Sequence, residues 1–413
     1  MEEHLKTTQQ LTSTPKRLWR GAARVAIILT MLAASLPALA QQPRVTRDGR
    51  SWVETSNGVL TPAGRVLRVN TDIGSIHIKG GAQGLRWTVT KRSFASSEQD
   101  ARRQFERFHI VAAKRNDIAT IEGNSAHGDM SRFTVDITIE VPREMQAISV
   151  NSQAGNVSVS NSAARVDAVT GGGNVDLDNI SGAVRARTAG GNIQIGTVNS
   201  ALAIKSGGGN INIANARQID VSTLGGNIAV GNTTGGLIQT GGGSIDVRHS
   251  GGELKVATAG GTVEIGDVNG PLRVDTGGGN IRVGGARGRV LAITGGGNIE
   301  LYKLAKGAQA QSGAGTITAE FIGGRGSFGD SALRTTAGDV VVYLSGGTSC
   351  TVHAASEMAS GRGIRSDFPE LKITSEGGDF GPKTMYLDGS INGGGPLLKV
   401  RTSIGQIEFR RSK

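Results

Sequence analysis

The feature that most constrains this chain is a repeat of 17 or 18 residues that recurs through residues 148–322. Each repeat contains a glycine-rich turn followed by an anchor residue, which is usually asparagine. The anchors are Asn156, Asn174, Asn192, Asn210, Asn227, Ser244, Thr262, Asn280, Asn298 and Thr316. A period of this length is typical of a solenoid, in which each repeat buries its apolar side chains only by stacking on its neighbours.

Apolar side chains keep fixed positions relative to the anchor. Every repeat has Val or Ile one residue after the anchor, and Val, Leu, Ile or Ala three residues after it. This alternation predicts a strand with one buried face after each turn. Another apolar column, six residues before the anchor, predicts a second strand before the turn. Its members are Val150, Ala168, Ala186, Ile204, Val221, Ile238, Val256, Val274, Ala292 and Ala310.

The polar positions of the repeat also predict structure. Glycine is expected to supply a positive φ at the corner, and the stacked asparagines are expected to hydrogen-bond along the stack. A hydroxyl column four residues before the anchor is expected to bond to the turn backbone. An ice-binding surface is disfavoured, because paired Thr-x-Thr columns are absent. The hydroxyl residues are Ser152, Thr170, Thr188, Ser206, Thr223, Thr240, Thr258, Thr276, Thr294 and Ser312.

These patterns predict an all-β protein, a β-solenoid of about 18-residue Gly-turned rungs with a small N-terminal helix-containing insertion. Rungs stacked roughly 4.8 Å apart would pair every strand with its neighbours around one core. The expected organisation is a signal peptide at 1–40, an N-terminal linker at 41–65 and the solenoid at 66–413. Within the solenoid we expect an insertion or cap at 81–147, regular rungs at 148–322, and irregular C-terminal rungs with a cap at 323–413.

Segments outside the regular array carry weaker signals. Ser96 and Gln99 resemble a capping box that opens a helix through about Phe108. Residues 132–142 alternate as a strand, whereas 345–396 is rich in turn signals and its strands are left unassigned. Partial matches to the rung template lie at 69–78, 333–342 and 400–409, the last of which is expected to close the stack.

The N-terminus has the pattern of an export signal. Four basic residues from Lys16 to Arg24 precede an apolar run from Val25 to Leu36, and Ala38-Leu39-Ala40 forms a cleavage site before Gln41. The apolar run is shorter than the roughly 20 residues that a membrane span needs, so we expect no transmembrane anchor in the mature chain. The expected location is the periplasm, or the cell surface and extracellular space.

One family resemblance is carried by three motifs. They are the segment Asp136–Pro142, which leads into a first Gly155-Asn156 turn, the many T-x-G-G-N-I-x-I rungs, and the closing segment Leu398–Ile407. Together these resemble the bacterial putative-adhesin family of β-strand-repeat proteins, over roughly residues 60 to 410. The resemblance implies an exported or cell-envelope β-solenoid and carries over no catalytic residues.

Composition argues against several kinds of chemistry. The formal charge is +11, or +8 without residues 1–40, which permits binding to anionic surfaces. Nucleic-acid binding is not expected, because the basic residues are scattered and only 4% of residues are aromatic. Cys350 is the single cysteine and is expected to be buried, so the chain has no internal disulfide.

Metal and cofactor motifs are also missing from the sequence. The turns lack the aspartates of calcium-binding β-rolls, and the match of Gly324, Gly326 and Gly329 to G-x-G-x-x-G is interpreted as a loop. No cofactor, metal, cofactor-binding or catalytic residue is therefore assigned. The histidines do not have zinc-ligand spacing; they are His4, His77, His109, His127, His249 and His353.

Asp246 and Glu264 are the candidate carboxylates on which an enzymatic function would rest. They occupy the same outward column of adjacent rungs, which would place two carboxylates about 5 Å apart, as in retaining glycosidases. The interpretation favoured is a solvated face, because no aromatic sugar platform flanks the pair and Arg282 follows on the next rung.

The functional prediction is a non-enzymatic, exported adhesin-like or envelope structural protein that presents a regular surface to a partner. A polysaccharide or another cell-surface or envelope component is the expected partner; the oligomeric state stays open. One alternative is a carbohydrate-active β-helix enzyme, either a lyase or a hydrolase. Another is a basic rod that binds anionic envelope polymers.

Overall fold

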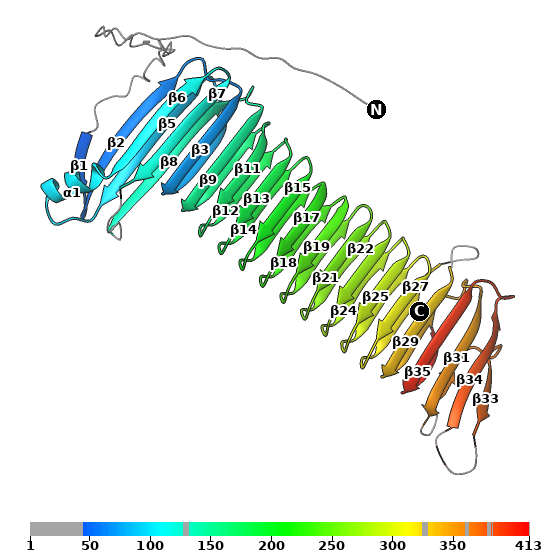
Figure 1. Ribbon diagram of the computed structural model, residues 1–413. Helices are drawn as coiled ribbons and strands as arrows, with labels where there is room; N and C mark the ends of the chain where they lie inside the picture. Colours follow the sequence, from blue (N-terminus) through cyan, green and yellow to red (C-terminus); the bar gives the residue numbers. More distant parts are fainter. Residues whose placement is uncertain are drawn as a thin grey trace, which may run out of the picture. The chain divides into compact units, whose positions relative to one another are not determined.

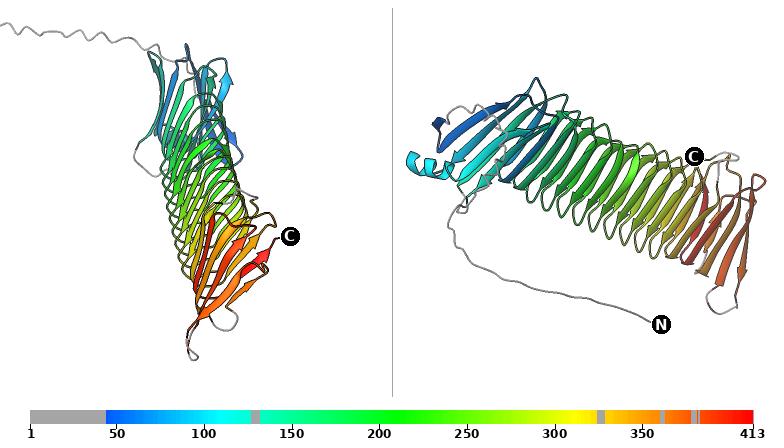
Figure 2. Two further views of the ribbon diagram at one scale, coloured as in Figure 1. Left: turned by 90° about the vertical axis from the view of Figure 1, so that its right-hand side faces the viewer. Right: turned by 45° about the horizontal axis from the view of Figure 1, so that its top comes forward.

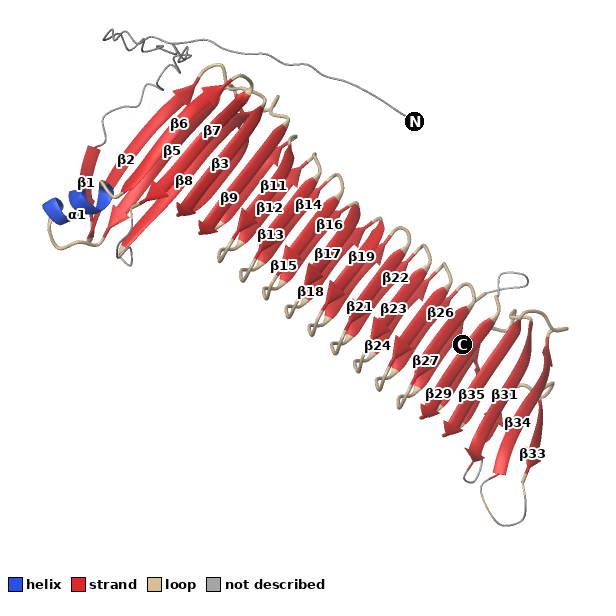
Figure 3. Ribbon diagram, in the orientation of Figure 1, coloured by secondary structure: helices blue, strands red, loops and turns tan. Residues whose placement is uncertain are grey.

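The computed structural model describes residues 44–126, 132–323, 329–359, 363–377, 381 and 383–412. The expected signal peptide at 1–40 lies outside these residues. The regular secondary structure of the described residues is β-strand apart from one helix, and the strands belong to two sheets of 18 strands each (Figures 1 and 3). The sequence-based prediction of an all-β solenoid is confirmed.

The first sheet, called sheet A, is defined by its pairings. In stacking order its strands are β1 (Arg44–Asp48), β2 (Ser51–Leu60), β5 (Leu85–Ser93), β8 (Phe133–Pro142), β4 (Ser75–Ala82), β10 (Val157–Ser162), β12 (Val175–Ile180), β14 (Ile193–Val198), β16 (Ile211–Ala216), β18 (Ile228–Thr233), β20 (Ile245–Ser250), β22 (Val263–Val268), β24 (Ile281–Ala286), β26 (Ile299–Leu304), β28 (Ile317–Phe321), β30 (Val340–Leu344), β36 (Ile407–Arg411) and β32 (Ile364–Ser366).

The second sheet, called sheet B, is defined in the same way. In stacking order its strands are β6 (Phe108–Arg115), β7 (Ile118–Ser125), β3 (Val66–Ile73), β9 (Ala147–Ala154), β11 (Arg165–Thr170), β13 (Val184–Thr188), β15 (Leu202–Ser206), β17 (Gln218–Thr223), β19 (Gly235–Thr240), β21 (Leu254–Thr258), β23 (Leu272–Thr276), β25 (Val290–Thr294), β27 (Ala308–Ser312), β29 (Ser331–Ala337), β35 (Leu397–Ile404), β31 (Cys350–Ala359), β34 (Lys383–Ile391) and β33 (Lys372–Glu376).

Each regular rung contributes one strand to each sheet, so a rung has two faces. The chain passes along sheet B, turns at the glycines, and returns along sheet A (Figure 2). Parallel pairing between rungs keeps equivalent positions in register, as in Ile228↔Ile245 and Val221↔Ile238. The inward columns of both sheets are buried and form one continuous core. The apolar columns predicted from the sequence are therefore the core.

The end rungs do not follow chain order. At the C-terminal end, β35 and β36 insert between the rung of β29 and β30 and the strands β31 and β32. The prediction that 400–409 closes the stack is therefore wrong, because β31 and β32 pair outside it. At the N-terminal end, β7 and β8 likewise pair outside the earlier strands β3 and β4.

The N-terminal end corrects two further expectations. The expected linker at 41–65 instead holds β1 and β2, and β2 pairs with β5 over nine residues from Trp52↔Ser93 to Leu60↔Leu85. The helix α1 (Glu98–Phe105) begins one residue later than the predicted capping box requires. Its N-cap is Ser97, whose Oγ accepts the Asp100 backbone N–H at 3.2 Å.

The glycine turns owe their composition to close stacking. In the turn Gly241–Gly243 no φ lies in the left-handed range, so the expected positive φ is not the reason for glycine there. A Cβ on Gly243 would lie 2.1 Å from the Gly226 carbonyl oxygen of the preceding rung. The third position of the regular turns is glycine throughout, whereas the first position accepts Ala189, Leu224 and Ala259. Direct backbone contact between rungs therefore excludes any side chain at the third position.

The hydroxyl column bonds to this same backbone, as predicted. Thr258 Oγ1 donates to the Gly243 carbonyl at 2.8 Å and accepts from the Gly261 N–H at 3.2 Å. Equivalent bonds recur from Thr170 to Ser312, and the hydroxyl-bearing side chains are buried. Each hydroxyl therefore satisfies one carbonyl of the preceding turn and one N–H of its own turn.

The asparagine column bonds along the stack in a different way from the one expected. Asn192 Oδ1 accepts the backbone N–H of Asn210 at 2.8 Å, so the bond joins an amide oxygen to the next backbone. Bonds between side-chain amides occur instead at the second turn, where Asn179 Nδ2 donates to Asn161 Oδ1 at 2.7 Å. Both of these residues have a positive φ, which asparagine tolerates better than most residues.

Candidate functional site

The carboxylates singled out from the sequence lie on the outer face of sheet A. Asp246 and Glu264 are exposed and pair directly in register between β20 and β22. Asp246 lines a shallow depression of about 280 Å³ with Arg248, Asn212 and Asn215, whereas Glu264 lies outside its lining. The predicted adjacency is present, but the two carboxylates do not share an enclosed site.

The neighbouring arginine is paired away from them. Arg282 Nη1 donates to Glu300 Oε2 at 2.7 Å, and its guanidinium lies 5.3 Å from the centre of the Tyr302 ring. Burial, followed by the negative charge of Glu300 and a hydrogen bond to it, raises the pKa of the Tyr302 hydroxyl. This cluster is a cross-strand charge pair on an exposed face, with an aromatic ring beside it.

Two of the histidines in the described residues, His77 and His353, make exposed polar contacts. His77 Nδ1 lies 2.7 Å from Ser158 Oγ across β4 and β10, and His353 Nδ1 lies 2.6 Å from Asp388 Oδ1 across β31 and β34. Within the described ranges, no group of three His, Cys, Asp or Glu side chains is placed to hold a metal ion. His4, His127, Gly324 and Gly326 lie outside the described residues.

Cys350 begins β31 and its side chain is buried in the core. Desolvation raises the pKa of its thiol to about 11. The thiol therefore stays protonated at neutral pH, and a buried, protonated cysteine is a poor nucleophile. The sequence-based expectation of a buried apolar role agrees with this environment.

The outer faces of the regular rungs carry different charges. On sheet A, acidic residues outnumber basic ones between β10 and β28; the acidic residues are Asp176, Asp178, Asp246, Glu264, Asp267, Glu300 and Glu320, against Arg248, Arg282 and Lys303. On sheet B, basic residues outnumber acidic ones between β9 and β27; the basic residues are Arg165, Arg185, Arg187, Lys205, Lys255 and Arg273, against Asp167, Asp220 and Asp275.

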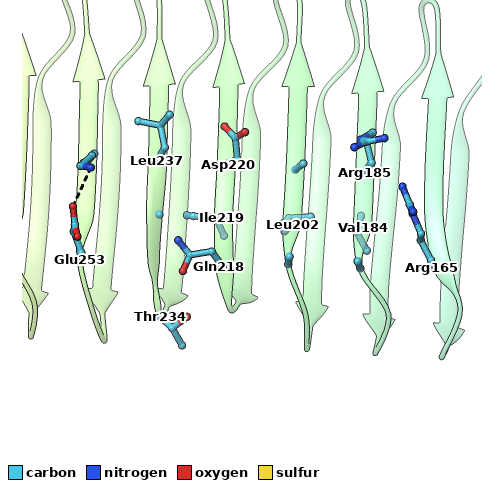
Figure 4. A pocket seen from close by; sticks show the side chains of 15 residues that line it. Arg165, Val184, Arg185, Leu202, Gln218, Ile219, Asp220, Thr234, Leu237 and Glu253 are labelled. Carbon is cyan, nitrogen blue, oxygen red and sulfur yellow. Dashed lines mark ion pairs between the residues drawn. The ribbon is translucent and has the colours of Figure 1, made fainter.

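A groove crosses the basic face, and we call it the sheet-B groove. It has a volume of about 820 Å³ and is lined by residues of the six neighbouring strands β11 to β21, together with residues of the turns before them (Figure 4). Arg165 and Arg185 stand at one end, and Glu253 pairs with Lys255 at 3.0 Å at the other. The floor is low because the outward position between Arg185 and Asp220 is Ala203.

The sheet-B groove was not predicted from the sequence, where the outward residues considered, such as Asp246 and Glu264, belong to the strand after each turn. The column that runs through Arg185, Ala203, Asp220 and Leu237 was available in the sequence. Ala203 is a small side chain between larger ones in this column, and that difference in size could have indicated a depression.

The sequence matches no protein-family model and no curated protein. Similar solved structures include one described as a putative cell adhesion protein from Clostridium sporogenes, with 8% identity and a TM-score of 0.19, covering 90% of this chain and 100% of that chain. A structure described as a putative adhesin from Bacteroides fragilis has 12% identity and a TM-score of 0.23, covering 71% of this chain and 96% of that chain.

A structure described as a putative adhesin from Parabacteroides merdae has 10% identity and a TM-score of 0.25, covering 71% of this chain and 95% of that chain. These descriptions agree with the family named from the sequence motifs. The architecture of the chain is defined by its own strand pairings. Within the described residues, no helix has the length and apolar character needed to cross a bilayer.

Proposed function

We propose that this protein is a non-enzymatic, exported adhesin-like protein of the cell envelope or surface, which binds a partner through an outer face of its solenoid. The observation that carries the proposal is the sheet-B groove, which continues over six stacked strands. A surface made from rungs in register repeats its chemistry along the stack, and such extended surfaces suit extended partners.

The two faces differ in how well they serve this role. The groove on sheet B, at about 820 Å³, is larger than the depression of about 280 Å³ beside Asp246 on sheet A. Recognition sites are usually concave, with a few polar groups at fixed positions. Sheet B is therefore the face that we assign to binding, with a polysaccharide or another envelope component as the partner.

A glycan array probed with the purified protein tests this proposal. Binding to at least one class of glycan, without release of cleavage products from that glycan, is the expected result. Cultured bacterial or host cells with their surface glycans intact provide a second readout of adhesion. Failure to bind any glycan and any cell surface would contradict the proposal.

The same assay separates adhesion from catalysis at sheet A. The double variant Asp246→Asn with Glu264→Gln keeps the shape of both side chains and removes both charges. Binding through sheet B is expected to be unchanged by it, to within about twofold, because the substitutions lie on the other sheet. Cleavage products that appear with the native protein and vanish with this variant would establish the enzyme in place of the adhesin.

A further inference from the structure

We propose that the sheet-B groove binds a stretch of an anionic polysaccharide, with Arg165 and Arg185 contacting its carboxylate, phosphate or sulfate groups. This inference rests on the proposed adhesin-like function and names the class of partner and the residues that select it. The groove, the unpaired basic residues at one end and the composition of its lining support it independently.

The groove has the dimensions of a polymer site. Its lining comes from the successive strands β11, β13, β15, β17, β19 and β21, which at the spacing of neighbouring strands amounts to roughly 24 Å. Figure 4 shows Arg165 and Arg185 on adjacent strands, followed along the stack by Leu202, Asp220 and Leu237. A ligand that fills this length is a chain of several units.

The basic end of the groove has free charges. In the described ranges, no carboxylate lies within ion-pair distance of Arg165, Arg185, Arg187 or Lys205, although other surface basic residues such as Arg273 and Lys255 are paired. Arg187 and Lys205 lie beside the groove and not in its lining, and they face each other in register between β13 and β15. Like charges directly opposite each other destabilise a sheet, and a bound anion relieves that repulsion.

The chemistry of the lining favours a polysaccharide over other anionic polymers. Arginine presents a planar fork of donors that matches carboxylate, phosphate and sulfate oxygens. The described lining has no aromatic side chain on which nucleic-acid bases would stack. Farther along, Gln218 and Thr234 offer hydrogen bonds of the kind that sugar hydroxyls accept and donate.

Affinity measurements on surface-immobilised polymers test the assignment. The probes are polygalacturonate and dextran sulfate as anionic polysaccharides, unmodified dextran as the neutral one, and polyglutamate and single-stranded DNA as anionic polymers of other classes. We expect the native protein to bind the two anionic polysaccharides more tightly than all the other probes, and this binding to weaken as salt screens the charges.

Two variants probe the groove in different ways. Arg165→Gln with Arg185→Gln removes two charges at the groove, and we expect about a tenfold or larger loss of affinity for the anionic polysaccharides. Ala203→Leu fills the floor without changing charge, and we expect a loss of several-fold. Ala203 faces outward and is half-buried, so this variant is expected to leave the fold intact.

The matched control is Arg334→Gln with Lys399→Gln, which removes the same charge from exposed positions of sheet B on β29 and β35. These strands lie roughly 38 Å or more along the stack from β13, several screening lengths at physiological salt. We expect this control to retain native affinity to within about twofold. Thermal unfolding of each variant confirms that differences in binding do not come from misfolding.

Each possible result distinguishes the groove from overall charge, or a polysaccharide from another partner. Equal losses in the groove variant and its matched control would mean that overall charge governs binding, which overturns the groove. Tight binding of polyglutamate or DNA with the same dependence on Arg165 and Arg185 would overturn the polysaccharide. Binding to neutral glycans or cells, with no affinity for anionic polysaccharides, would overturn this inference and leave the proposed function standing. No binding to any probe, glycan or cell would overturn both.

Discussion

The close contact between the backbones of neighbouring rungs makes a sharp prediction about Gly243. An alanine there would place its Cβ 2.1 Å from the Gly226 carbonyl oxygen, whereas ordinary contact begins at 3.4 Å. The atoms must therefore separate by about 1.3 Å, which is the difference between those distances. The Gly226 oxygen also accepts a hydrogen bond from Thr240 Oγ1 at 2.8 Å, so it cannot move without weakening that bond.

The magnitude follows from these two effects. Overpacking in a tightly packed structure costs about 1–3 kcal/mol, and leaving a buried carbonyl without its donor costs a similar amount. We therefore expect Gly243→Ala to lower the free energy of unfolding by about 3 kcal/mol or more. Urea denaturation followed by circular dichroism measures this value, and hydrogen exchange in the paired strands β18 and β20 locates the effect.

The matched control lies in the same turn. A Cβ on Gly242 would meet nothing within 4 Å, and its φ is outside the left-handed range. Gly242→Ala is therefore expected to be neutral, or to stabilise by up to about 1 kcal/mol through the loss of freedom in the unfolded chain. Equal destabilisation by the two substitutions would refute the reasoning, because the distinction rests entirely on contact with the preceding rung.

Two further predictions concern the core. Thr258→Val is expected to lower the free energy of unfolding by about 1–3 kcal/mol, because the Gly243 carbonyl and the Gly261 N–H lose their partner. Thr258→Ser keeps a hydroxyl and should retain most of this free energy in urea denaturation. Equal stability of the Val and Ser variants would refute the bonding role of the hydroxyl. Cys350, with a pKa of about 11, should resist iodoacetamide at pH 8 in the native protein and react on unfolding. Burial raises the pKa of this thiol above its ordinary value of 9.0. The contribution of the thiol to the stability of the fold is therefore present below about pH 9 and is lost as the pH rises towards 11. Denaturation midpoints measured across that pH range would reveal this loss.

Much of the regular array could be predicted from the chain because each rung repeats one local pattern. The columns that begin with Val150 and Val157 mark the buried faces of β9 and β10, and the hydroxyl column marks the turn bonds. Alternation reports which side of a strand faces inward, and a constant period implies constant register. The adjacency of Asp246 and Glu264 followed from the same register.

The ends of the stack depended on long-range pairing. Nothing local to residues 407–411 indicates that β36 lies between β30 and β32, since each of these strands has the same kind of inward face. The chain forms the outer strand β32 first and then returns to place β36 between β30 and β32. This order depends on which strand edges are left unpaired in the folded stack. In the same way, β1 and β2 formed strands where the sequence pattern predicted a linker, because β5 offered β2 an open edge.

The sequence by itself determined much of the rung: its length, a strand on each side of the glycine turn, its buried columns and its hydroxyl ladder. That these two strands complete the rung was decided by the structure. The tertiary structure alone decided why the third turn residue must be glycine, since that reason is the carbonyl oxygen of the preceding rung. It also decided where the charges gather. Arg165 and Arg185 are separated by 20 positions in the chain but lie on adjacent strands, because each rung advances the stack by only about 4.8 Å. Stacking therefore converts scattered basic residues into one face and one groove.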